Sequence, residues 1–460
     1  MREDTFPPLG GPIQLFYTPV GGARLPVVSH AEGIYVWDKD GRRYLDASSG
    51  PVCTNIGHGN ARVIRAANAQ MERAAFASRN FFENEANSQL AELLARLAGP
   101  GLERAFIVSG GSEATEAAIK MARQLAVSRG ESQRWKVLSR NPSYHGASLG
   151  AVAVTGDPFS EALFAPLTRI MPKVSPPFTY RVPENFTVET YAEHCAAALE
   201  QAIRDEGPES VLAFLMEPVG GLATGGLVAT DAYYMAVREI CTRYGILLIY
   251  DEVMSGAGRT GKFLSAEHWP EARPDLVTLA KGVSSGYTPL GVVLASAEAV
   301  DMLRNAGGFA HGHTYSANPL SCAIAYAALS ETVERGLMEN ATHIGTLLKR
   351  RLEGLVERHE HAGDVRGKGL LMGFEIVANK QTKAPFAPDD PAIYRLVQIA
   401  KQKGLLLYTR RTAQGRFGDW VMITPPLITN EEQVDELVAL LDQSLEVFSE
   451  ERAAARKVSA

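Results

Sequence analysis

An aspartate and a lysine that follow two apolar runs form the pair of side chains best suited to chemistry. Asp251 ends the run 246–250, and Lys281 follows the run 276–280. Each run predicts a buried parallel strand, and open α/β sheets bind ligands at the carboxyl ends of such strands. A desolvated lysine and an aspartate suit pyridoxal phosphate, whose aldehyde the amine binds and whose ring nitrogen the carboxylate keeps protonated. Taken alone, the pair also fits a loop-capping aspartate and a surface lysine.

A second candidate site lies where the short apolar run 105–108 leads through glycines into a helical pattern. Glycine lets the backbone approach a ligand closely, and free amides at a helix start attract an anion. Gly111 and Ser112 are therefore candidates for a phosphate cradle, with a glycine turn and a serine cap as the alternative. Tyr144 and His145 follow the next predicted strand, where an aromatic ring could stack on a planar ligand or serve a structural role.

The elements that must position these residues alternate in type. Strand and helix patterns alternate from about residue 104 to 296, which predicts an α/β fold with a large, mostly parallel sheet and helices on both faces. A long helix over roughly 320 to 360, further strands and a terminal helix predict a smaller α+β domain built from both chain ends. We expect an N-terminal segment of the small domain at 1–60, a large domain at 61–325 and the C-terminal small domain at 326–460.

Composition limits the class of protein. Of 460 residues, 46% are hydrophobic and 21% charged, and the net charge of -6 argues against nonspecific nucleic-acid binding. The scattered cysteines Cys53, Cys195, Cys241 and Cys322 indicate neither a zinc ribbon nor a disulfide framework. Neither a signal segment nor an apolar run of membrane-spanning length is evident, so we expect a cytoplasmic protein without membrane association.

Other motifs would indicate different chemistry, but the residues around them argue against those functions. Residues 256–261 match a dinucleotide fingerprint, but they do not follow the predicted strand directly and lack a good crossover helix, which argues against a nicotinamide oxidoreductase. Phe263 stands where a nucleotide-binding loop needs a hydroxyl for magnesium. The histidine pairs at 311/313 and 359/361 lack a nearby cysteine or carboxylate triad, so we expect no metal.

Six motifs, in order, resemble those of the class III aminotransferases over nearly the whole chain. They are SGGSEA at 109–114, YHG at 144–146, EPV at 217–219, DEV at 251–253 with GRTG at 258–261, KG at 281–282 and GHTYS at 312–316. The resemblance implies a transaminase of the fold-type-I pyridoxal phosphate architecture, with pyridoxal 5'-phosphate as cofactor.

The resemblance also implies roles for individual residues. Lys281 would hold the cofactor covalently and act as catalytic base, and Asp251 would pair with the ring nitrogen. The other implied cofactor contacts are Gly111 and Ser112 at the phosphate, Tyr144 and Val253 on the two sides of the ring, and His145 and Glu217 nearby. Thr314 would reach the phosphate of the neighbouring subunit's cofactor, which implies an obligate homodimer with shared sites, possibly paired into a tetramer.

Departures from the family pattern narrow the range of possible substrates. Leu222 and Met422 stand where ornithine-type and γ-aminobutyrate-type relatives carry a glutamate and an arginine that pair, which disfavours α,ω-diamino acids and dicarboxylate-linked substrates. The amine:pyruvate or ω-amino acid:pyruvate group is the better match. In that group an arginine before the Pro-Pro pair binds the acceptor's carboxylate. Here we favour Arg416 over Arg410 and Arg411.

Further candidates for substrate contact are Val52, Phe82 and Tyr17. Val52 stands where many amine transaminases carry a tryptophan, which weakens the case for aromatic amines. The expected reaction moves an amino group from an amine or ω-amino acid to pyruvate or a similar 2-oxo acid, in two stages through Lys281. An aminomutase, racemase or decarboxylase of the same fold remains an alternative.

Overall fold

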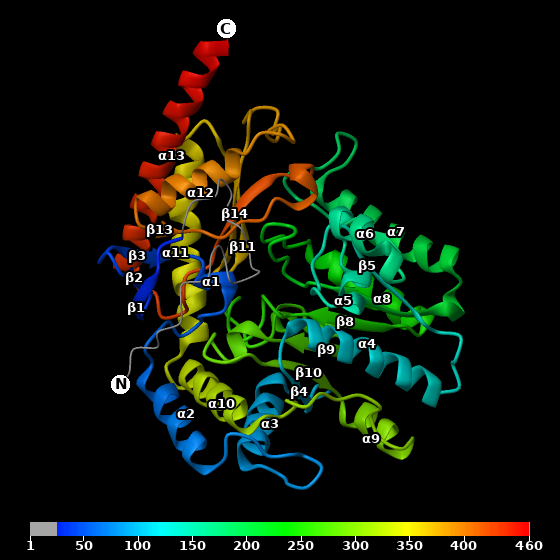
Figure 1. Cartoon of the computed structure of the whole chain (residues 1–460). Coiled ribbons are helices and arrows are strands. Elements are labelled where there is room, and N and C mark those ends of the chain that lie inside the picture. The colour runs from blue at the N-terminus through cyan, green and yellow to red at the C-terminus, as the bar shows by residue number, and fades with distance from the viewer. Residues whose placement is uncertain (1–24, 460) are drawn as a thin grey trace.

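A seven-stranded sheet with strand order β4-β10-β9-β8-β7-β5-β6 forms the centre of the protein (Figure 1). The computed structural model describes residues 25–459, and the side chains of residues 25–455. Strands β5 to β9 pair in parallel, whereas β10 runs antiparallel to both β9 and β4. The strands are β4 (Arg104–Val108), β5 (Lys136–Arg140), β6 (Lys173–Val174), β7 (Val211–Met216), β8 (Leu247–Asp251), β9 (Leu276–Leu279) and β10 (Gly291–Ala295).

Both faces of this sheet are covered, because successive strand residues enter different apolar clusters. In β8, Leu248 and Tyr250 lie in one cluster and Ile249 lies in another. The first cluster contains side chains of α3 (Glu85–Ala98), α7 (Val188–Glu206) and α8 (Asp231–Tyr244), and the second those of α4 (Gly111–Ser128) and α9 (Ala297–Asn305). The alternation places helices on both faces of a mostly parallel sheet. The α/β fold expected from the sequence is confirmed.

Two smaller sheets lie beside the long helices (Figure 1). One is antiparallel, and the other pairs three N-terminal strands with a late one. Their strands are β11 (Ala362–Lys368), β12 (Leu371–Ile376) and β14 (Asp419–Ile423), then β1 (Val28–Glu32), β2 (Tyr35–Asp38), β3 (Arg43–Asp46) and β13 (Leu405–Leu406). Ile34 and Leu45 share an apolar cluster with Leu348 and Leu441. This shared core supports the proposal that both chain ends build one small domain, with boundaries near 60 and 325.

The single helix expected over 320 to 360 is wrong, because two helices occupy that range. They are α10 (Pro319–Glu334) and α11 (Leu337–Arg358). Gly336 between them has φ +62, a left-handed conformation that interrupts helical geometry and that glycine adopts without strain. The remaining α-helices are α1 (Ser49–Val52), α2 (Ala61–Arg73), α5 (Leu149–Val154), α6 (Pro158–Phe164), α12 (Ala392–Gln402) and α13 (Glu431–Ser459). Within the described part of the chain, no helix is both long and apolar enough to span a membrane.

Candidate active site

A cavity of about 1270 Å³ opens where the parallel strands end. Asp251 is the last residue of β8, Glu217 directly follows β7, and Lys281 follows β9, so three buried strands deliver three polar side chains to one edge of the sheet. Eight residues predicted to contact the cofactor line this cavity: Gly111, Ser112, Tyr144, His145, Glu217, Asp251, Val253 and Lys281.

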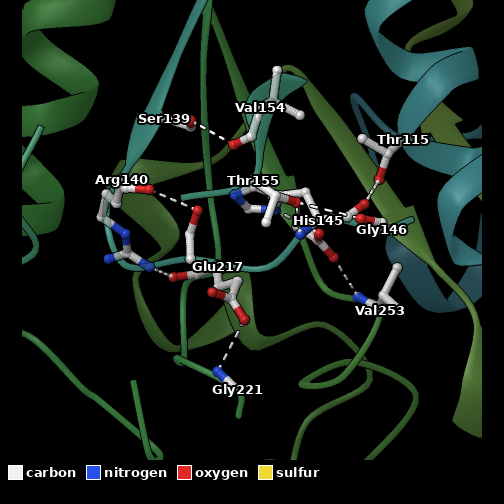
Figure 2. A network of polar contacts seen from close by, with 12 residues as sticks. Thr115, Ser139, Arg140, His145, Gly146, Val154, Thr155, Glu217, Gly221 and Val253 are labelled. Carbon is white, nitrogen blue, oxygen red and sulfur yellow. Dashed lines mark hydrogen bonds and ion pairs between the residues drawn. The ribbon is translucent and has the colours of Figure 1, made fainter. Parts of the chain in front are cut away.

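Asp251 is held by contacts on both of its carboxylate oxygens. Its side chain is 5% exposed, and Oδ2 lies 2.8 Å from His145 Nδ1. Oδ1 accepts a hydrogen bond from the Val253 backbone N–H at 3.0 Å. Figure 2 shows Glu217 near His145 and Val253; Oε1 of Glu217 accepts a hydrogen bond from the Gly221 N–H at 3.0 Å. Burial raises the pKa of Glu217, and the nearby charge of Asp251 raises it further.

Two residues that line the cavity each carry a buried polar atom without a hydrogen-bond partner: Nε2 of His145 and Oε2 of Glu217. Unpartnered buried polar atoms are costly, and native structures keep them chiefly where function requires them. No sequence pattern singles out Arg140, the last residue of β5, which is buried and donates through Nη2 to the carbonyl oxygen of Glu217 (Figure 2).

Lys281 combines an unusual backbone with a perturbed amine. It begins the short 3-10 helix at Lys281–Val283 with φ +44, a left-handed conformation that is costly for a residue with a side chain. Burial lowers the pKa of its amine, opposed by the charges of Cys53, Asp251 and Glu217. A larger neutral fraction at a given pH makes the amine a better nucleophile and proton acceptor.

The start of α4 forms another part of the cavity wall, beside Val253 and Ala280. Gly110, Gly111 and Ser112 border the cavity, and the 18-residue helix that begins at Gly111 directs its first backbone amides toward that end. A Cβ added to Gly111 would lie 2.9 Å from Val253 Cγ1, so the helix start packs more closely than a side chain allows. This arrangement fits an anionic group such as a phosphate.

Four residues predicted to contact substrate or a partner's cofactor are not among those that line this cavity. Val52 is 1% exposed and packs in the core, while its neighbours Pro51 and Cys53 line the cavity. Val52 ends α1, whose backbone is irregular, with positive φ at Ser49, Gly50 and Val52, so no regular period in the sequence predicts which side chains face the cavity. Phe82 is 66% exposed, and Thr314 and Arg416 are also exposed. Tyr17 lies outside the described residues.

The structure distinguishes the three candidate arginines. Arg411 makes a buried ion pair with Asp419, with N–O distances of 2.7 and 3.1 Å. Arg416 is not among the lining residues, whereas Arg410 is, and its guanidinium lies 5.4 Å from the centroid of the Tyr144 ring. Of the three, only Arg410 lines the cavity.

These residues fit pyridoxal phosphate. A lysine amine, a carboxylate for the ring nitrogen, an aromatic ring and an anion-binding helix start all line one cavity. When bound, the cofactor supplies an aldehyde that reacts with amines and a protonated ring that withdraws electrons from the reacting carbon. The protein's own residues would orient the cofactor, hold the ring proton through Asp251, and move a proton at the substrate carbon through Lys281. The fold and the site together define the class of protein as a fold-type-I pyridoxal phosphate enzyme.

Comparison with known proteins identifies the family. Residues 17–445 match the model of "Aminotransferase class-III". The chain is 36% identical to the uncharacterized aminotransferase YodT of Bacillus subtilis, over 91% of this chain and 95% of the relative. It is 33% identical to a putrescine–pyruvate aminotransferase of Pseudomonas aeruginosa, over 92% and 91%. A solved amine transaminase from an uncultivated Pseudomonas species, in a PLP-bound form, superposes with a TM-score of 0.86 at 33% identity, over 96% and 99%.

The chain belongs to the class III aminotransferases. It is therefore a transaminase, and its cofactor is pyridoxal 5'-phosphate. The resemblance stated from the six sequence motifs is confirmed.

Proposed function

We propose that this enzyme transfers the amino group of an amine or ω-amino acid to pyruvate or a similar 2-oxo acid, in two stages through Lys281. The observation that carries the proposal is the placement of Lys281 and Arg410 on the walls of one cavity. The amine is the reacting group in both stages. The guanidinium is a carboxylate receptor, because it presents paired N–H donors that match the two oxygens of a 2-oxo acid.

Each residue of the cofactor site has a proposed role. Lys281 binds the cofactor and acts as the catalytic base, and Asp251 holds the proton on the ring nitrogen. His145 fixes the orientation of Asp251 through their 2.8 Å contact. The other proposed contacts are Gly111 and Ser112 at the phosphate, Tyr144 and Val253 on the two sides of the ring, and Glu217 beside it.

Two observations favour amines over dicarboxylates as donors. Leu222 lines the cavity with its apolar side chain, and Met422 is fully buried, so neither position offers a charge to a second carboxylate. The names of two relatives, a putrescine–pyruvate aminotransferase and an amine transaminase, are consistent with this substrate class.

We also propose a homodimer with shared sites. Large exposed apolar side chains gather on two nearby segments: Phe76, Phe81 and Phe82 on one and Tyr315 on the other, with the Phe76 and Tyr315 rings 6.1 Å apart. Thr314, beside this surface, is exposed and lies outside its own chain's cavity, as expected for a residue that contacts the cofactor of a neighbouring subunit.

We also propose a cytoplasmic location. The four free cysteines agree with the reducing conditions there.

The test is amino transfer from a simple amine to pyruvate, followed as alanine formed by the purified, cofactor-loaded enzyme. We expect alanine in an amount equal to the carbonyl product of the amine, and none with Lys281→Ala. Failure to form alanine from any amine or ω-amino acid in a panel of chain lengths would overturn the proposal.

A further inference from the structure

A buried carboxylate faces Arg410 in the cavity wall. Asp157, which directly precedes α6, is 4% exposed and lines the cavity. Its Oδ2 accepts hydrogen bonds from Ser160 Oγ at 2.8 Å and from Arg410 Nη2. Among the described side chains, Arg410 is the only basic group that forms an ion pair with Asp157. The cavity therefore contains an internal anion whose charge one arginine neutralises.

The two side chains of this ion pair differ in how freely they can move. The Asp157 side chain is 6% exposed and that of Arg410 is 41% exposed. Arg410 lies between β13 and the short 3-10 helix at Thr412–Gly415, outside any helix or strand, and its long side chain has several rotatable bonds. When the arginine turns toward another anion or out of the cavity, the carboxylate stays in place. The hydrogen bond from Ser160 would remain, but a buried carboxylate without a cationic partner is unfavourable, so that state favours the binding of another cation.

We propose that Asp157 binds the distal ammonium of a diamine donor, in exchange for Arg410. This inference rests on the proposed function, because it names the donor class for the same cavity. With a 2-oxo acid, Arg410 binds the substrate carboxylate. With a diamine, one amino group reacts at Lys281 while the other takes the place of the guanidinium beside Asp157. The pair of Arg410 and Asp157 then serves an anion in one stage and a cation in the other.

Exchange of Arg410 for an ammonium group can be distinguished experimentally from a purely structural role of Asp157. Asp157 competes with every substrate carboxylate for the guanidinium of Arg410. Removing the charge of Asp157 should therefore weaken diamine binding and strengthen carboxylate binding at once. Damage to the cavity wall would instead weaken both.

The experiment compares Asp157→Asn with the wild-type holoenzyme and with Asp205→Asn, the same change at an exposed position on α7 outside the cavity. Butane-1,4-diamine and butylamine are matched in length, and each is titrated against the visible absorbance of the bound cofactor. Inhibition by acetate reports on the carboxylate-binding position. We expect Asp157→Asn to raise the ratio of diamine to butylamine half-saturation about tenfold or more, and to make acetate a tighter inhibitor.

A second variant keeps the proposal falsifiable if Asp157→Asn does not fold. Arg410→Ala uncovers Asp157, so the diamine should bind more tightly relative to butylamine while acetate binds more weakly. Equal changes for both amines, or weaker acetate binding in Asp157→Asn, would overturn the role of Asp157, as would a wild-type enzyme that reacts with butylamine but not the diamine. Reaction with neither amine would instead count against the proposed amine donor.

Discussion

Replacing Arg410 by alanine should weaken the binding of pyruvate specifically. A hydrogen bond between charged groups contributes about 1.5–3 kcal/mol. Two facts reduce the net effect in this cavity: the Arg410 side chain is 41% exposed, and pyruvate must replace the bond to Asp157. We therefore expect a loss of about 1.5–2.5 kcal/mol, which corresponds to about a 10- to 70-fold rise in the KM for pyruvate.

The assay is steady-state alanine formation at a saturating amine concentration with pyruvate varied. Arg416→Ala is the matched control, because Arg416 is exposed and does not line the cavity. Its KM for pyruvate should match that of the wild type. The reasoning is refuted if Arg416→Ala raises this KM and Arg410→Ala leaves it unchanged.

Three further perturbations test other parts of the site and the fold. In cofactor-free protein at pH 8, Lys281 should react faster with an acylating reagent than exposed lysines do, because burial lowers its pKa and enlarges its neutral fraction. Peptide mass spectrometry measures the rate at which each lysine is labelled, and labelling of Lys281 at an equal or lower rate would contradict the prediction. Gly111→Ala should weaken pyridoxal phosphate binding about tenfold or more, because its Cβ would lie 2.9 Å from Val253 Cγ1; cofactor titration by fluorescence measures the Kd. Leu248→Ala, fully buried in β8, should lower the free energy of unfolding by about 2–5 kcal/mol, which denaturant titration would reveal.

Most of the proposed cofactor site could be predicted from the sequence, because its residues lie at the ends of regular elements. Asp251 and Lys281 each follow an apolar strand pattern, and Gly111 precedes a helical one, so the rules of parallel sheets bring them together. Their placement in one cavity agrees with the expectation.

The residues proposed to contact substrate were harder to predict from the sequence, because they lie on irregular segments. Val52 was expected at the cavity, yet it ends the irregular segment α1 with a φ of +64, where side-chain directions follow no period, and it packs into the core. Only tertiary contacts distinguish the candidate arginines. Arg411 forms an ion pair with Asp419, whereas Arg410 lines the cavity. No sequence pattern relates Asp157 to a residue 253 positions later in the chain.

The most direct test of two-stage amino transfer through Lys281 is a two-step titration of the purified holoenzyme followed by visible absorbance. We expect an amine donor to bleach the absorbance of the bound cofactor, pyruvate then to restore it, and Lys281→Ala to abolish the cycle. Bleaching that pyruvate cannot reverse, with any donor in the panel, would contradict transfer from an amine to a 2-oxo acid through one site.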